Sequence, residues 1–484
     1  MRTKEHSIYY MGLTAIVASV GVGCGDFRGA ESEEVGQVES AVLTGVRIST
    51  DPSFPSEGQA ETAAVVQRST GNGYFSFNTD DPTHLTYPTS TSRRICKGTS
   101  MAGFNTRDTG GGYGSMRRVP VPFNISALWG DPALGYVNGS VFLSQLASPT
   151  DRFNVASGNQ NCWTNSNGSG AEPMLSGACI FQSTSQTLNP TFSAAVVCLR
   201  TGNDFYDGGS LSGDGGSQMY AAYWNVTQNR IDVWRGPSWS RLPSPFPGKS
   251  IGGHPISVDG IQVIAPDSAG NLWLSNYSTG SNTWSTPIFV GGPVLDSATL
   301  SNGVTIRDVG YSVARGGAEN GIVPPITYIA YNKAAGSFAQ VRIAACQQSP
   351  VTGVFGCSDL PSLATSSTAN SFMPAIALAH RGTQAPFDVQ VRVSFWSDQG
   401  LTGGQIRLRS FNTANPGVIS QSSAQTACPD TRGYMGDYDD MIVVNDRTAS
   451  PQFRRPYTDS TDTTCSRQMY VAAPQHVSVW SLGI

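Results

Sequence analysis

Short apolar runs alternate with turns rich in Gly, Ser, Asn and Thr from about Thr44 to the C-terminus. Runs of this kind, bounded by such turns, are typical of short β-strands. A unit of strand, turn, strand, turn and strand recurs at a spacing of roughly 45–70 residues. Its copies are found at residues 61–78, 130–147, 217–236, 256–285, 326–346, 389–412 and 439–460.

The repeat predicts an all-β fold. One such sheet cannot bury both of its faces alone, whereas sheets stacked face to face around an axis cover one another and hide most edges. We therefore expect residues 45–484 to form a single β-propeller of four-stranded blades, six or seven in number. The alternative is a pair of tandem β-sandwiches. It is the weaker expectation because no linker is evident between Thr44 and Ile484.

The amino-acid composition supports the prediction of β-strands and argues against a nucleic-acid partner. Only 13% of the 484 residues are charged, and the chain has 54 Gly and 29 Pro, which is unlike a helical protein. The formal net charge of −4 and the lack of a basic stripe give no case for a nucleic-acid partner. We expect a monomer that requires no cofactor.

The first residues have the features of an export signal. Arg2 and Lys4 precede an apolar segment, 8–23, that is too short and too Gly-rich to span a bilayer. The segment runs into Cys24 and resembles a bacterial lipobox, which predicts a signal peptide at 1–23 and lipid attachment at Cys24. Residues 24–44 are then an acidic, flexible tether. The alternative is an ordinary cleaved signal followed by a chance cysteine.

Without Cys24, an even number of cysteines remains, which in an exported chain indicates disulfides. They are Cys96, Cys162, Cys179, Cys198, Cys346, Cys357, Cys428 and Cys465. Cys346 and Cys357 flank a Gly-containing turn and are expected to bridge a hairpin. Proximity suggests Cys428–Cys465 and Cys162–Cys179, which leaves Cys96–Cys198. Many other pairings are open, so the oxidised state is the firmer prediction.

We expect an exported bacterial protein at the outer surface or in the periplasm, held at the membrane only by the lipid anchor.

Residues 106–113 read Thr-Arg-Asp-Thr-Gly-Gly-Gly-Tyr and match the pattern [ST]-x-D-x-G-x-x-[WFY]. This resembles the Asp-box of the sialidase superfamily and other Asp-box propellers. The resemblance implies a structural turn between the third and fourth strands of a blade, formed by Thr106, Asp108, Gly110 and Tyr113. The Asp carboxylate would accept backbone N–H groups, the Gly would permit positive φ, and the aromatic ring would pack between sheets.

Weaker resemblance to exported sialidase-like propellers covers about residues 46–470. It includes the turn Gly130-Asp131-Pro132 before an apolar strand and the segment 434–441, YMGDYDDM. Two incomplete Asp-box copies begin at Ser212 and at Asp267. The resemblance implies a secreted or surface-anchored protein but no particular reaction, because one fold hosts many functions.

An enzymatic role is the alternative to binding. The resemblance implies that a sialidase would need an arginine cluster for a carboxylate, a Tyr activated by a Glu, and an Asp acid/base. Its Arg-Ile-Pro motif is replaced here by Arg47-Ile48-Ser49. The residue types needed for a glycan-cleaving site occur at Glu319, Arg432 and Tyr434. The alternative for Glu319 is an exposed loop carboxylate.

The densest carboxylate group in the chain is Asp437, Asp439 and Asp440. Like charges this close repel one another unless a cation or protons intervene, so Ca²⁺ is the metal these residues would take. The favoured alternative is a turn in which the carboxylates accept backbone amides.

Four tryptophans in related contexts are candidates for stacking on sugars: Trp234, Trp239, Trp273 and Trp284. The favoured alternative is packing between blades. We expect a propeller that binds a glycan or a surface protein through its loop face. The alternatives are a glycoside-cleaving enzyme, such as a divergent exo-sialidase, and a structural envelope protein.

Overall fold

The structure is a computed structural model, and the residues that it describes lie in one compact unit, Glu39–Ile484. The described residues are 46–47, 59–67, 72–80, 94–95, 97–105, 117–118, 125–149, 163–164, 177–183, 192, 195–199, 204–214, 216–295, 297–299, 305–307, 310–316, 325–360, 369–384, 388–398, 405–412, 415–426, 440–460 and 475–483. Their regular structure consists of β-strands, which confirms the all-β prediction. This part of the chain contains no helix long and apolar enough to span a membrane.

Most strands belong to antiparallel groups of four that follow one another along the chain. The first group is β2 (Gln59–Gln67), β3 (Asn72–Asp80), β5 (Lys97–Asn105) and β6 (Arg117–Arg118). The second is β7 (Ile125–Val137), β8 (Ser140–Pro149), β10 (Gly177–Ser183) and β11 (Ala195–Leu199). A single pair of residues, Lys97 of β5 and Leu128 of β7, joins these two groups into one larger sheet.

Two further sheets occupy the middle of the chain, and the first of them is β12 (Tyr206–Gly213), β13 (Met219–Asn225), β14 (Arg230–Arg235) and β15 (Ser240–Arg241). The other is β16 (Ile256–Val258), β17 (Gln262–Pro266), β18 (Leu272–Ser278), β19 (Thr283–Trp284) and β20 (Ile288–Gly291). In the second sheet β18 pairs with both β19 and β20. The last strand is thus interrupted, and residues 285–287 lie between its two parts.

The next sheets are β23 (Tyr311–Gly316), β24 (Ile326–Ala335), β25 (Phe338–Gln348) and β26 (Phe355–Asp359), then β27 (Ser371–Arg381), β28 (Asp388–Ser397), β29 (Gln405–Asn412) and β30 (Asn415–Thr426). The final sheet joins the two ends of unit 39–484. It contains β31 (Ile442–Val444), β32 (Gln452–Ser460), β33 (Gln475–Gly483) and β1 (Val46–Arg47). Two small ladders complete the set: β21 (Ser297–Thr299) with β22 (Thr305–Arg307), and β4 (Arg94–Ile95) with β9 (Trp163–Thr164).

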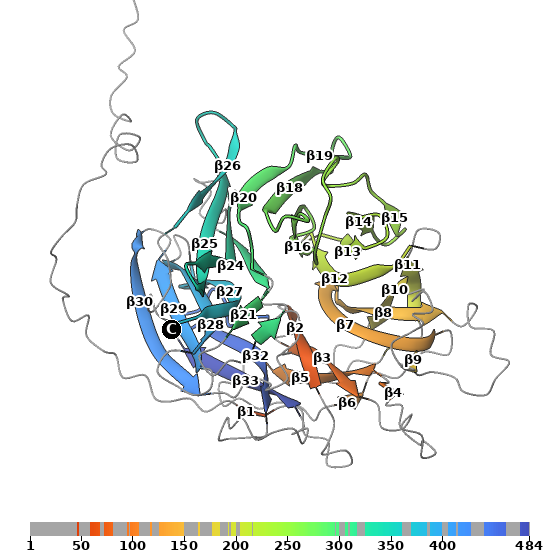
Figure 1. Ribbon diagram of the computed structural model, residues 1–484, viewed down its shortest axis with the longest axis horizontal. Helices are drawn as coiled ribbons and strands as arrows, with labels where there is room; N and C mark the ends of the chain where they lie inside the picture. The colour runs from red at the N-terminus through yellow and green to blue at the C-terminus, as the bar shows by residue number, and fades with distance from the viewer. Residues whose placement is uncertain are drawn as a thin grey trace, which may run out of the picture. The chain divides into compact units, whose positions relative to one another are not determined.

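The first strand of each group contacts the first strand of the next. The contacts run from β2 to β7, β12, β16, β23, β27 and β31, and β31 contacts β2 again. Figure 1 shows the blue strands β32 and β33 beside the orange-red strand β2, although they are far apart in sequence. Successive sheets are therefore neighbours in space.

Hydrophobic clusters lie between successive sheets. One unites Ala133 of β7 and Phe142 of β8 with Tyr206 of β12 and Tyr223 of β13. Others follow between the next pairs of sheets along the chain. Strand β13 shows the consequence, since its burial pattern leaves only Trp224 partly exposed. Both faces of this sheet are covered, so each sheet depends on its neighbours for its core.

Two disulfides are present among the described residues, and each links directly opposed residues of adjacent antiparallel strands. Cys346 of β25 pairs with Cys357 of β26, which confirms the hairpin prediction. Cys179 of β10 pairs with Cys198 of β11, so the expected pairings Cys162–Cys179 and Cys96–Cys198 were wrong. Cys96, Cys162, Cys428 and Cys465 lie outside the described residues. Disulfides fit an exported protein because they persist in oxidising compartments.

Candidate functional site

Most residues singled out from the sequence lie outside the described part of the chain. These are Cys24, Thr106, Asp108, Gly110, Tyr113, Glu319, Arg432, Tyr434, Asp437 and Asp439. The Asp-box sequence falls between β5 and β6, the third and fourth strands of their group. The roles of all these residues remain predictions.

Asp440 is the described member of the predicted carboxylate group. Its Oδ2 atom accepts a hydrogen bond from the backbone N–H of Ala64 in β2 at 3.0 Å. Its Oδ1 atom accepts the N–H of Met441 at 2.8 Å. Asp440 thus stabilises the junction between the last sheet and β2. No group of three or more His, Cys, Asp or Glu side chains suited to a metal occurs among the described residues.

The four candidate tryptophans pack between sheets. Trp239 is 9% exposed and meets the ring of Phe142 edge-on, with 6.4 Å between the ring centroids. Trp234 lies against the same cluster. Trp273 and Trp284 lie against the cluster of the next sheet junction, so the four rings do not form a single platform. Their packing role is clear, and their glycan-binding role remains a prediction.

The incomplete Asp-box copies are turns organised by a carboxylate. Asp214 Oδ1 accepts the backbone N–H groups of Gly216 and Gln218 at 2.8 and 3.2 Å. Asp267 accepts the N–H groups of Ala269 and Asn271, both at 2.9 Å, and the indole N–H of Trp273. These contacts are those expected of an Asp in a tight turn. They follow β12 and β17, so they occupy different turns from the Asp-box.

The described residues form a pocket of about 490 Å³ between the sheet β16–β20 and the sheet β23–β26. One side comes from β17, β18, β20 and the interruption between β19 and β20. The other comes from β23, the start of β24 and the hairpin of β25 and β26. The lining residues are Gln262, Asn276, Ser285, Thr286, Ile288, Arg315, Pro325, Gln348, Gly353 and Phe355.

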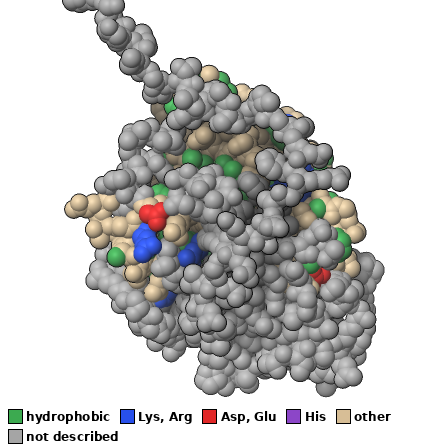
Figure 2. All heavy atoms as spheres, turned by 90° about the vertical axis from the view of Figure 1, so that its left-hand side faces the viewer, with side chains coloured by type: hydrophobic (Ala, Val, Ile, Leu, Met, Phe, Trp, Pro, Cys, Tyr) green, Lys and Arg blue, Asp and Glu red, His purple; other side chains and the backbone are tan. Residues whose placement is uncertain are grey.

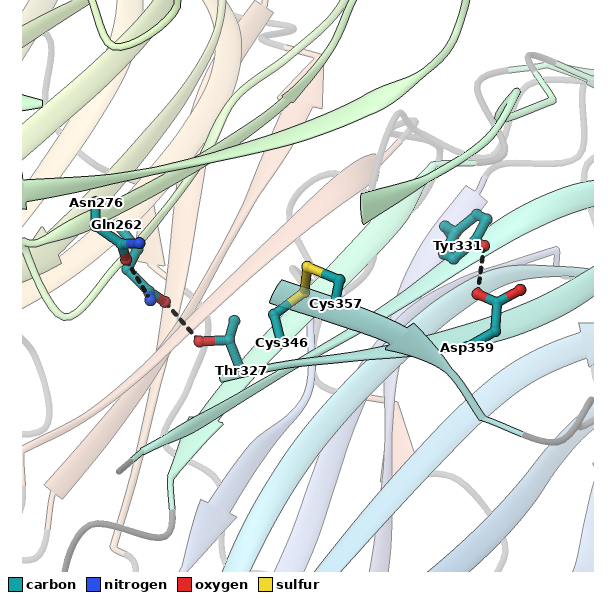
Figure 3. Close-up of a disulfide and its surroundings, with 7 residues drawn as sticks. All are labelled: Gln262, Asn276, Thr327, Tyr331, Cys346, Cys357 and Asp359. Atoms are coloured by element: carbon teal, nitrogen blue, oxygen red, sulfur yellow. Dashed lines mark hydrogen bonds between the residues drawn. A yellow bond between two sulfur atoms is a disulfide. The ribbon is translucent and has the colours of Figure 1, made fainter. Parts of the chain in front are cut away.

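A chain of side-chain hydrogen bonds fixes the amides on one wall (Figure 3). Thr327 Oγ1 donates to Gln262 Oε1 at 2.7 Å, and Gln262 Nε2 donates to Asn276 Oδ1 at 2.7 Å. Gln262 is only 2% exposed, so this chain determines its orientation. The amide N–H₂ of Asn276 is left for other partners because Asn276 uses its oxygen in the chain.

Apolar side chains from both sheets line the pocket, and a disulfide supports the side formed by β25 and β26. Ile288 and Phe355 pack against the cluster that contains Ile264, Leu274 and Ile329. The Cys346–Cys357 bond (Figure 3) crosses the hairpin of β25 and β26. The same hairpin carries Gly353 and Phe355. The pocket therefore combines preset polar groups with two large apolar side chains.

A second cluster joins three neighbouring first strands. Asp131 of β7 and Asp207 of β12 both accept the backbone N–H of Gly208, each at 3.1 Å. His254, which precedes β16, has its Nε2 atom 3.7 Å from Asp207 Oδ2. A Cβ on Gly208 would collide with the imidazole of His254, so this close approach needs glycine. The cluster therefore brings two carboxyl groups and an imidazole together.

Both strands are irregular at this point. The register shifts in β7 between Gly130 and Ala133, and in β12 between Asp207 and Gly209. Asp131 has a φ of 53°, which is uncommon for a residue other than glycine. The Gly130-Asp131-Pro132 turn expected before a strand is thus an irregularity within β7. Such irregularities direct side chains away from the regular pleat.

The environment of Asp207 favours its charged form. Burial acts to raise the pKa of Asp207, but the hydrogen bond and charge of His254 oppose it, together with hydrogen bonds from Asp131 and Gly208. The net result is a lowered pKa. The side chains of His254 and Asp207 are 24% and 34% exposed, whereas Asp131 is 7% exposed. The pair thus faces solvent while Asp131 lies beneath it.

Among the described residues on the face in Figure 2, blue side chains lie beside a red one, and green and tan atoms make up most of the rest. Neither the pocket nor the Asp–Asp–His cluster was predicted as a site. The sequence signal for both was weak because common polar residues from distant segments form them.

No protein-family model and no curated protein matches the sequence. Similar solved structures include a protein of unknown function from Dyadobacter fermentans, at 10% identity over 93% of this chain and 98% of that one, with a TM-score of 0.41. The intramolecular trans-sialidase of Ruminococcus gnavus is 12% identical over 92% and 98%, with a TM-score of 0.39. A fungal alcohol oxidase in complex with copper is 9% identical over 91% and 76%, with a TM-score of 0.47. These likenesses carry no statement about function.

Proposed function

We propose that this chain is an exported β-propeller that binds a glycan in the pocket between the sheet β16–β20 and the sheet β23–β26. The composition of the pocket carries this proposal. Amide and hydroxyl groups can donate to and accept from sugar hydroxyls, and a guanidinium can donate to them. The apolar side chains of Ile288 and Phe355 suit the C–H faces of a sugar ring. The volume lies within the usual range of about 300–1,000 Å³ for ligand pockets.

The proposed architecture is a closed ring of seven four-stranded blades. Its support is the cycle of contacts between first strands, which returns from β31 to β2. The pairing of β1 with β33 adds a strand from the start of the unit to the last sheet. The Cys24 lipid anchor, a bacterial origin and a monomeric state complete the proposal. They rest on the sequence alone.

A second candidate function is glycoside cleavage, and the Asp131–Asp207–His254 cluster favours it. An imidazole and a carboxylate that face solvent can transfer protons to and from a substrate. Both carboxyl groups accept the same backbone N–H of Gly208, each at 3.1 Å. Two-carboxylate glycosidases instead place the sugar between their two carboxyl groups. Binding at the pocket is therefore the better supported function.

A glycan-array screen of the purified protein, with Thr286→Tyr as a blocking variant, tests the proposal. Thr286 is an exposed residue that lines the pocket, so a tyrosine there would fill it. The matched control is Thr279→Tyr, in the exposed turn between β18 and β19. We expect glycan binding that is lost in Thr286→Tyr and retained in Thr279→Tyr. Equal loss in both variants, or no binding by the native protein, would refute the pocket as a glycan site.

Glycoside cleavage is tested with fluorogenic glycosides of the glycans that bind on the array. Cleavage that disappears in Asp207→Asn would assign an enzymatic function to the Asp131–Asp207–His254 cluster. Binding without cleavage would support the proposed function. Silence in both assays would leave a protein partner or a structural envelope role.

A further inference from the structure

Arg315 is the one charged residue among those that line the pocket in the described part of the chain. It lies near the end of β23, and its side chain is 17% exposed. A guanidinium presents five N–H donors in a planar fork. Its placement gives an otherwise neutral pocket a fixed positive charge.

Asp259 is the ion-pair partner of Arg315. The Nη1 atom of Arg315 lies 2.8 Å from Asp259 Oδ2, and the Asp259 side chain is 54% exposed. Asp259 and Gly260 form the turn between β16 and β17, with φ values of 49° and 66°. Asp259 does not line the pocket. An ion pair with one largely exposed member contributes little stability, so it can be exchanged at little cost.

The remaining donors of Arg315 are only partly used. Its Nε atom is buried and makes no hydrogen bond to the described residues. A ligand carboxylate supplies two oxygens in the plane of the fork, so it can take the place of Asp259 at Nη1 and also reach a donor that Asp259 leaves unused.

We propose that the pocket selects glycans that carry a carboxylate, such as a uronic acid, and that Asp259 occupies the guanidinium of Arg315 when no ligand is bound. This inference rests on the proposed glycan-binding function. The ligand carboxylate replaces the carboxylate of Asp259, while the amides and hydroxyls of the pocket hold the neutral part of the sugar. Asp259 thus competes with the acidic ligand.

The test compares three matched oligosaccharides that differ in one substituent: a neutral hydroxymethyl group, a carboxylate or a sulfate ester. Calorimetric titration measures each dissociation constant at low and high salt. We expect the carboxylate form to bind about tenfold more tightly than the neutral one, the scale of one added charge-assisted hydrogen bond. Added salt should reduce this preference. A preference for sulfate over carboxylate would overturn the carboxylate assignment.

Variants separate Arg315 from Asp259. Asp259→Asn should strengthen binding of the carboxylate oligosaccharide several-fold and leave the affinity for the neutral oligosaccharide unchanged. Arg315→Gln should abolish the preference for the carboxylate oligosaccharide but still bind the neutral one. Arg315→Lys should retain part of that preference. Arg342→Gln is the control, since Arg342 pairs with Asp359 at 3.2 Å and does not line the pocket. Asp388→Asn, on β28, removes an exposed negative charge elsewhere and should change nothing.

The two proposals fail in different ways. Equal binding of the neutral and acidic forms, or weaker acid binding in Asp259→Asn, would overturn the carboxylate inference and leave glycan binding intact. If none of the three oligosaccharides bound, the glycan-binding function and the inference that rests on it would both be overturned.

Discussion

Removal of the Cys346–Cys357 disulfide should destabilise the protein measurably. The two cysteines are directly opposed in β25 and β26 and are separated by 11 residues along the chain. Closing a loop of this length removes about 3 kcal/mol of conformational entropy from the unfolded chain, in the chain-entropy model. The double variant Cys346→Ala/Cys357→Ala should therefore lose about 3 kcal/mol of unfolding free energy.

The second disulfide provides a matched comparison. Cys179 and Cys198 are also opposed in adjacent strands, and 19 residues separate them. Because the entropy term grows only with the logarithm of loop length, the loss in Cys179→Ala/Cys198→Ala should exceed the first by less than about 0.5 kcal/mol. The two double variants should therefore unfold at similar denaturant concentrations.

Equilibrium urea unfolding, followed by tryptophan fluorescence, measures both losses. Hydrogen exchange adds a local measurement, since amides of β26 should exchange faster in the Cys346→Ala/Cys357→Ala variant. This hairpin also carries Gly353 and Phe355, so glycan affinity should fall in that variant alone. A loss below about 1 kcal/mol in both variants would refute the loop-entropy reasoning.

Two other predictions concern the acid–base cluster and the remaining cysteines. The lowered pKa of Asp207 means that its charged form stabilises the fold at pH 7, and this contribution is lost as the pH falls below about 4. The Asp207→Asn variant should thus have a lower free energy of unfolding than the native protein at pH 7. Urea unfolding at pH 3 should show a smaller difference in unfolding free energy between the two proteins. An equal difference at both pH values would refute the lowered pKa of Asp207. Cys96, Cys162, Cys428 and Cys465 lie outside the described residues. We expect these four cysteines to be oxidised to disulfides, and peptide mapping that found any of them as a free thiol would count against it.

The repeated pattern of short apolar runs was enough to predict strands. Residues 217–236, for example, contain β13 and β14 with a turn between them. The Cys346–Cys357 bond was predictable because a single tight hairpin joins its strands. Cys179–Cys198 was missed because proximity along the chain also suggested Cys162, and the sequence does not fix which strands pair.

The pocket and the acid–base cluster could not be predicted because they form between sheets. Gln262 and Arg315 meet only when the sheet β16–β20 packs on the sheet β23–β26. Asp131 was noticed as part of a turn, but its neighbours Asp207 and His254 come from later strands. Local patterns predict strands and turns, whereas these sites depend on which sheet faces which.

A crystal structure of the protein with the strongest array ligand is the most direct test of glycan binding at the pocket. The account predicts the sugar between the two sheets, with hydrogen bonds to Asn276 and an acidic substituent at Arg315. Ligand bound instead at the tryptophans or beside Asp207, with the pocket empty, would contradict it.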